Sequence, residues 1–142
     1  MSIAIVNYGV GNIKSIQHCL NRFGLSHEYT SDYNKILNSE KVIFPGVGDA
    51  AYAMNKLKSR GLDKVIIDIK QPLLGICLGM QLLCNSTREG NTDCLGIIDV
   101  DVLKFDSENE KVPQIGWNNI YDLDSKIFSD TNENDFIYMV HS

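Results

Sequence analysis

Short apolar runs alternate with segments of helical spacing along the first half of the chain, and this alternation limits the possible folds more than any other feature. Residues 3–6, 27–30, 41–44 and 73–76 predict strands. Helical spacing follows at residues 13–23, 32–37, 49–60, 62–67 and 78–84. Asn12 can cap the first of these segments, Ser31 or Asp32 can cap the second, and Asp49 begins the third. The pattern predicts an α/β fold of three layers, a largely parallel sheet with helices on both faces.

The predicted strands also suggest where a site would lie. Ligands of open parallel sheets bind at the carboxyl ends of the strands. We therefore expect the turns after Val6, Phe44 and Ile76 to lie along one edge of the sheet.

The second half of the chain is less regular. We predict a strand over 97–105, a charged loop over 107–111, a turn over 114–118 and a strand over 135–142. The whole chain, 1–142, is expected to be a single domain. Because a doubly wound sheet rarely stops at a strand, we also expect this domain to lack its C-terminal part.

Composition excludes several classes of function. Among 142 residues, 18 acidic side chains outnumber 13 basic ones, and no basic run could follow a nucleic acid backbone. No apolar run approaches the ~20 residues that span a bilayer. The four cysteines show neither Cys-x-x-Cys pairs nor zinc-type histidine spacing, so no metal site is expected. Without a Gly-x-Gly-x-x-Gly or Walker loop, we expect no cofactor. The absence of cysteine pairs in the sequence favours a reduced, cytoplasmic protein.

The segment Gly75-Ile76-Cys77-Leu78-Gly79 has the form of a nucleophile elbow. Small neighbours allow the sharp turn between strand and helix that exposes a nucleophile, and a helix N-terminus favours the thiolate of Cys77. A buried, inert cysteine is the alternative. The strand, the flanking glycines and the following helix together favour the nucleophile.

Backbone N–H groups near Cys77 are candidates for an oxyanion hole. The N–H of Leu78 follows the nucleophile directly, and Pro45-Gly46-Val47-Gly48 ends a neighbouring strand. We expect the Val47 N–H to be the second donor, because Gly46 makes that peptide easy to rotate. Gln81, one helical turn beyond Cys77, is placed to face the same pocket.

A thiolate enzyme of this kind also needs a general base, usually histidine. His18 and His27 are better explained as structural or exposed residues, and nothing in the sequence marks His141 as a base.

Taken together, the elbow Gly75-Ile76-Cys77-Leu78-Gly79-Met80-Gln81 and Pro45-Gly46-Val47-Gly48 resemble the class I (triad) glutamine amidotransferases, which hydrolyse glutamine and pass the ammonia to a partner. Four segments narrow the resemblance to the glutaminase subunit of imidazole glycerol phosphate synthase, in histidine biosynthesis. They are Asn7 to Asn12, Pro45 to Gly48, Pro113 to Asn118 and Tyr138 to Ser142. The resemblance covers the whole chain.

The resemblance implies a role for each matching residue. Cys77 would form the glutamyl thioester, and Val47 and Leu78 would supply the oxyanion N–H groups. Asn12 and Trp117 would face the partner, a (β/α)8-barrel cyclase with which the chain would form a heterodimer. The glutamine pocket would be lined by Gly46, Gly48, Gln81, His141 and Ser142.

Three departures accompany the resemblance. Asn7 stands where the family usually has aspartate, and Gln114 where it usually has histidine. The family's His-Pro-Glu segment, which carries the base and its orienting carboxylate, would fall beyond Ser142. We therefore expect the 142-residue form not to turn over glutamine.

Other functions remain open at this point. The two substitutions leave room for a paralogue that feeds ammonia to another synthase, such as one modifying a surface sugar. A regulator that binds a synthase without catalysis is a second alternative. Cysteine hydrolases and deglycases of similar fold carry Cys-His-Gly at the elbow, whereas Leu78 follows Cys77 here. A flavodoxin-like cofactor binder would need a nucleotide loop that the sequence lacks.

Overall fold

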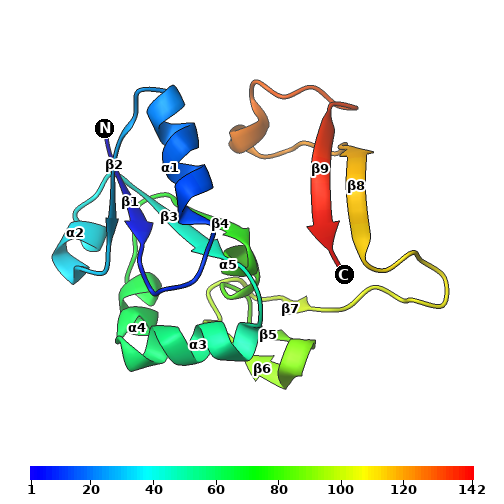
Figure 1. The fold of residues 1–142 in the computed structure, drawn as a ribbon, viewed down its shortest axis with the longest axis horizontal. Helices are drawn as coiled ribbons and strands as arrows, with labels where there is room; N and C mark the ends of the chain where they lie inside the picture. Colours follow the sequence, from blue (N-terminus) through cyan, green and yellow to red (C-terminus); the bar gives the residue numbers. More distant parts are fainter. The chain divides into compact units, whose positions relative to one another are not determined.

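The four predicted apolar runs form one parallel sheet. The computed structural model describes all residues, Met1–Ser142, and the sheet belongs to the first of two compact units, Met1–Leu103. Its strands lie in the order β2-β1-β3-β4, and every neighbouring pair is parallel. They are β1 (Ser2–Val6), β2 (Ser26–Thr30), β3 (Lys41–Gly46) and β4 (Leu73–Cys77). The carboxyl ends therefore share one edge, as predicted (Figure 1).

Helices cover both faces of this sheet. On one face Ile3, Ile5 and Ile43 form a cluster with Leu20 of α1 (Ile13–Arg22). On the other, Val6, Phe44 and their neighbours form a larger cluster with the remaining helices. These are α2 (Tyr33–Leu37), α3 (Ala50–Ser59), α4 (Leu62–Ile67) and α5 (Leu78–Gln81). The three-layer α/β prediction is confirmed.

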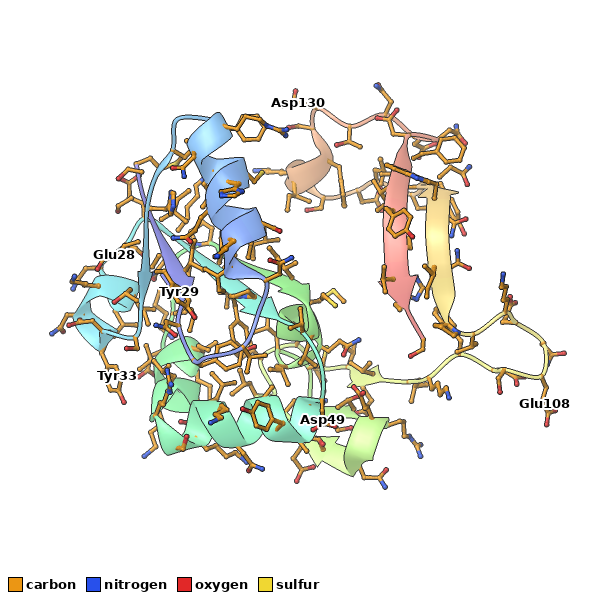
Figure 2. All side chains as sticks on the ribbon, in the orientation of Figure 1. Glu28, Tyr29, Tyr33, Asp49, Glu108 and Asp130 are labelled. Carbon is orange, nitrogen blue, oxygen red and sulfur yellow. The ribbon has the colours of Figure 1, made fainter.

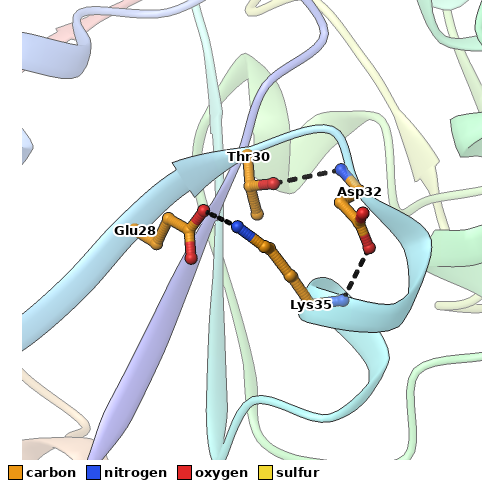
Figure 3. A network of polar contacts seen from close by, with 4 residues as sticks. All are labelled: Glu28, Thr30, Asp32 and Lys35. Atoms are coloured by element: carbon orange, nitrogen blue, oxygen red, sulfur yellow. Dashed lines mark hydrogen bonds and ion pairs between the residues drawn. The ribbon is translucent and has the colours of Figure 1, made fainter.

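Two helices begin at aspartate caps, as the sequence indicates. Asp32 accepts a hydrogen bond from the Lys35 N–H at 3.0 Å, and Lys35 forms an ion pair with Glu28 of β2 at 2.5 Å (Figure 3). Asp49 accepts from the Tyr52 N–H at 2.7 Å and lies at the start of α3 (Figure 2). Such caps satisfy the free N–H groups of a first turn and fix where the helix starts.

The prediction of an apolar helix through Cys84 is wrong, because α5 ends at Gln81. Leu83 and Cys84 donate to carbonyls three residues back, which tightens the turn. Residues 95–98 then donate hydrogen bonds to the carbonyls that follow α5. The Leu95 N–H donates to the Leu82 carbonyl, and the Ile97 and Ile98 N–H groups donate to the Leu83 carbonyl. Long-range hydrogen bonds therefore replace the helical ones.

The same contacts explain why the predicted strand over 97–105 is also wrong. Only Asp101–Val102 (β7) of that range is a strand, and it pairs with β5 (Ser86–Thr87). The opposite edge of β5 pairs with β6 (Thr92–Asp93), and a short 3-10 turn, η1 (Glu89–Asn91), lies between β5 and β6.

None of the helices has the length and apolar character that crossing a bilayer requires.

Strand β4 is less buried than predicted. Leu74 is 41% exposed and Ile76 is 37% exposed, because β4 is the last strand of the sheet and has a neighbour on one side only. Their face of the sheet is the one on which Ile3, Ile5 and Ile43 pack against α1.

The second unit, Lys104–Ser142, is built on an antiparallel pair of strands. The predicted strand at the end of the sequence is confirmed as β9 (Phe136–His141). The predicted turn at 114–118 is wrong, since Gln114–Asn119 forms β8 and pairs with β9 along its whole length. The charged segment 107–111 is irregular, as expected, and η2 (Lys126–Phe128) is a 3-10 turn. The single-domain organisation stays a prediction.

Candidate active site

Cys77 lies at the junction between β4 and α5, as predicted. Its backbone angles are φ 54° and ψ -120°, a conformation that side chains other than glycine rarely adopt. Its side chain is exposed. A strained backbone holding an exposed thiol at the end of a strand is the arrangement expected of a nucleophile elbow. The alternative of an inert thiol sealed in the core does not fit this residue.

The end of β3 lies directly beside the elbow. In the register of the two parallel strands, Gly46 is the partner of Cys77. Val47 follows immediately and is 48% exposed. The structure therefore brings Cys77 and the predicted oxyanion loop, Pro45 to Gly48, together at one edge of the sheet.

Three glycines allow this close approach. A Cβ on Gly79 would collide with the Phe44 carbonyl oxygen, and one on Gly46 would collide with the Gly79 nitrogen. A Cβ on Gly75 would lie 2.6 Å from the Cα of Met80. The sequence suggests glycine at position 46 because it allows the peptide to rotate easily. In the structure the backbone of α5 packs directly against Gly46, which leaves no room for a side chain.

The first turn of α5 presents backbone donors to the same edge. Leu78 is the first residue of α5, so its N–H has no acceptor within its own helix. The Leu78 side chain is 2% exposed, which anchors this peptide in the core. Because α5 is a single turn, local N–H groups rather than a long helix dipole act on the thiol. A Cβ on Gly48 would meet nothing within 4 Å, so the loop faces open space there.

Two neighbours on α5 differ in their environment. Gln81, the last residue of the helix, is half-buried one turn from Cys77, and its predicted role in glutamine binding stays a prediction. Met80 is 51% exposed, whereas Leu82 and Leu83, which follow α5, are buried.

Tyr8 is a residue near the site that was not predicted from the sequence. This residue is 0% exposed, and its hydroxyl donates a hydrogen bond of 2.6 Å to the Pro45 carbonyl. The available signal was the alternation of Ala4, Val6 and Tyr8, which places all three on one face of β1 and its continuation.

Asn12 lies at the start of α1, where it was expected both to cap the helix and to face a partner. It makes no side-chain capping hydrogen bond, so the capping prediction is wrong. Its side chain is exposed instead, which leaves the amide free for an external contact. The preceding turn is tied down by Arg60, whose guanidinium donates to the Asn7 carbonyl at 3.3 Å.

Neither histidine of the first unit is placed to serve Cys77 as a base. The Nδ1 atom of His27 hydrogen-bonds the Leu25 carbonyl at 3.0 Å. His27 lies on β2, three strands from β4 and therefore ~14 Å away at the usual strand spacing. His18 is an exposed residue of α1. Both fit the structural interpretation made from the sequence.

The other predicted site residues belong to the second unit. His141 ends β9 and pairs with Gln114, and its ring packs at a tilt against Phe105 with ring centroids 5.2 Å apart. Together with Asn118 and Met139 it lines a groove of ≈ 760 Å³. Trp117 is 67% exposed and meets Tyr138 edge-on. Ser142 is exposed. The roles of His141, Ser142 and Trp117 stay predictions.

The other cysteines are unlike Cys77 in place or burial. Cys84 is buried and Cys94 is half-buried, and burial raises the pKa of both thiols. Cys19 is exposed on α1, away from any strand end. No group of three or more His, Cys, Asp or Glu side chains is arranged to hold a metal ion.

Comparisons with known proteins bear on the whole chain. Residues 4–142 match the model of the glutamine amidotransferase class-I family. The chain is 47% identical to imidazole glycerol phosphate synthase subunit HisH of Bacteroides thetaiotaomicron, over 100% of its own length and 74% of that protein. Identity to the HisH subunit of Bacteroides fragilis is also 47%, with the same coverage. The HisH subunit of Dehalococcoides mccartyi is 44% identical, over 99% of this chain and 70% of that protein. The chain therefore belongs to the class-I glutamine amidotransferase family, among the relatives of the HisH subunits.

Proposed function

We propose that this chain is the glutaminase subunit of an imidazole glycerol phosphate synthase in histidine biosynthesis. Together with a general base, which neither His18 nor His27 supplies, it would hydrolyse glutamine to glutamate and pass ammonia to a cyclase subunit, a (β/α)8 barrel with which it would form a heterodimer. The observation that carries the proposal is the exposed Cys77 in its strained elbow, with Gly46 as its register partner. The 47% identity to HisH subunits over the whole chain supports the choice of synthase.

The geometry suits acyl transfer at the glutamine side chain. The Cys77 thiolate attacks the amide carbon, and the negative charge moves to the carbonyl oxygen. The N–H groups of Leu78 and Val47 stabilise that oxygen. The C–N bond then breaks, the nitrogen takes the proton that a general base had removed from the Cys77 thiol and leaves as ammonia, and Cys77 holds a thioester. Water attacks the thioester, which releases glutamate and restores the thiol.

The resemblance implies roles for the remaining predicted residues. Gly46, Gly48, Gln81, His141 and Ser142 would bind glutamine. Gly46 lies beside the nucleophile, Gly48 borders open space, and Gln81 is one helical turn away. The exposed amide of Asn12 and the exposed ring of Trp117 would contact the cyclase.

A glutaminase assay with the cyclase partner tests the proposal, using the protein as its gene encodes it. Cys77→Ala should lower glutamate release by at least about 10³-fold, because loss of a nucleophile removes the covalent route. Cys19→Ala, which changes another exposed cysteine, should leave the rate unchanged. Equal rates for Cys77→Ala and the wild type would rule out the proposed nucleophile.

Two further measurements separate the rival functions. A regulator without catalysis would form no adduct at Cys77 with a glutamine-analogue alkylator, as judged by mass spectrometry. A paralogue for a different synthase is suggested by Asn7 and Gln114, which depart from the family pattern. It would release glutamate with that synthase but fail to support imidazole glycerol phosphate formation with the cyclase.

A further inference from the structure

We infer that Tyr8 is a positioning residue for the glutaminase reaction, because its buried hydroxyl holds the first peptide of the oxyanion loop, Pro45–Gly46. The inference rests on the proposed function and adds a residue to it. The hydroxyl of Tyr8 donates its hydrogen bond to Pro45, so Tyr8 would act through Pro45.

The hydrogen bond joins two strand ends. Tyr8 lies two residues past the end of β1, and Pro45 is the fifth residue of β3. The 2.6 Å bond runs from the Tyr8 hydroxyl to the Pro45 carbonyl, and both residues are almost completely buried. The Pro45 carbonyl belongs to the peptide immediately before the Gly46–Val47 peptide, whose N–H is the proposed oxyanion donor.

The ring of Tyr8 is itself held in place. It packs against Phe44 with ring centroids 5.4 Å apart, within the larger core cluster. Burial raises the pKa of Tyr8, so its hydroxyl stays protonated and remains a donor. The donor therefore has one orientation and one acceptor.

The hydrogen bond from Tyr8 holds the oxyanion loop at Pro45, where the chain leaves β3. On its other side Gly46 packs against the backbone of Gly79, which fixes the loop relative to α5. Beyond Gly46 the loop is open, since Val47 is 48% exposed and Gly48 borders empty space. The Tyr8 bond is the one side-chain hydrogen bond that reaches the segment Pro45 to Gly48. It sets the plane of the Pro45–Gly46 peptide and thereby limits the direction of the next N–H.

The test compares Tyr8→Phe with Tyr29→Phe in the protein with its cyclase partner. Both changes remove one hydroxyl, but Tyr29 lies on β2 in the other core cluster. For Tyr8→Phe we expect kcat for glutamate release to fall about tenfold with KM unchanged, less than the 10²- to 10³-fold typical of losing an oxyanion donor outright. Tyr29→Phe should retain the wild-type kcat.

A second readout separates positioning from general damage. Alkylation of Cys77 by iodoacetamide displaces iodide at a saturated carbon and forms no oxyanion, so its rate should be unchanged in Tyr8→Phe. Replacing Tyr8 with 4-aminophenylalanine, which keeps an N–H donor at the same place, should restore kcat. This variant also serves if Tyr8→Phe folds poorly. A kcat for Tyr8→Phe equal to that of Tyr29→Phe, or a replacement that folds but does not restore kcat, would overturn the inference.

The controls distinguish this inference from the function on which it rests. If Cys77→Ala keeps wild-type turnover, the proposed function fails and the role of Tyr8 fails with it. If Cys77→Ala is inactive and Tyr8→Phe is fully active, only the role of Tyr8 fails.

Discussion

Gly46 and Cys77 are register partners at the carboxyl ends of β3 and β4, and the backbone of Gly79 packs against Gly46. The proposed nucleophile and the proposed oxyanion loop are thus placed by contacts between main chains. Because these contacts leave no room for side chains, substitutions of the site glycines should change the stability of the protein by measurable amounts.

We predict that Gly79→Ala destabilises the protein more than Gly48→Ala. A Cβ at Gly79 would collide with the Phe44 carbonyl, so the helix and strand must separate, at a loss of about 3 kcal/mol. Gly48 has φ +85° but open space around it, so only backbone strain of about 1–2 kcal/mol is expected. Urea unfolding measures both. Equal losses would mean that the packing against β3 is not tight.

Cys77→Gly should be more stable than Cys77→Ala, by about 1–3 kcal/mol, because glycine relieves the strained backbone at φ 54°. The control is Cys19, which lies in the regular helix α1. There, glycine should be less stable than alanine by about 1 kcal/mol. The midpoints of urea unfolding for the four variants give the comparison, and the same order at both positions would contradict a strained elbow.

Thiol labelling should separate the cysteines by position and pH. At neutral pH a maleimide should label the exposed Cys77 and Cys19 and spare Cys84 and Cys94, whose pKa values are raised by burial above the ordinary 9.0. Labelling is followed by mass spectrometry of peptides. Rapid modification of Cys84 in folded protein would contradict its burial.

The same raised thiol pKa values predict a loss of stability in alkali. A group whose pKa is higher in the folded state stabilises that state below its ordinary pKa, here 9.0. The contribution disappears as the pH rises through the folded-state pKa, because the unfolded chain ionises first. Unfolding midpoints should therefore decrease above pH 9 and decrease less in Cys84→Ser, which cannot ionise in this range.

Trp117→Ala should weaken cyclase binding without unfolding the subunit. Trp117 is 67% exposed, so little folding energy depends on it, whereas a buried interface tryptophan typically contributes ~2 kcal/mol or more, about 30-fold in Kd. Tyr121→Ala removes an equally exposed aromatic of the same unit, 68% exposed, and should bind normally. Isothermal titration with the cyclase measures both. Unchanged binding of Trp117→Ala would remove this residue from the proposed interface.

The sequence predicted most of the first unit because its elements carry local signals. The apolar run before Tyr8 and the caps Asp32 and Asp49 correspond to observed strands and helices. The errors lie where distant hydrogen bonds decide the structure. Leu82 and Leu83 continue an apolar helical pattern, but their carbonyls accept from residues 95–98, which ends α5 early.

The second unit shows the same limit. Gln114 to Asn118 is polar and contains glycine, which is typical of a turn, yet it forms a strand because β9 pairs with it. For the site, the sequence predicted Cys77 and the Pro45 to Gly48 turn at one edge of the sheet, and the structure adds that Gly46 is the register partner of Cys77. The hydrogen bond from Tyr8 to Pro45 did not, because it joins residues 37 positions apart.

The contact between Gly46 and Gly79 also bears on how this protein can vary over evolutionary time. The elbow is supported by contacts between main-chain atoms, which every amino acid has. Substitutions elsewhere in the core can therefore accumulate without moving the Cys77 sulfur. Changes in the surrounding packing therefore affect the chemistry of the site little. Selection acts instead on Gly46, Gly75 and Gly79, where any side chain would collide with the main chain.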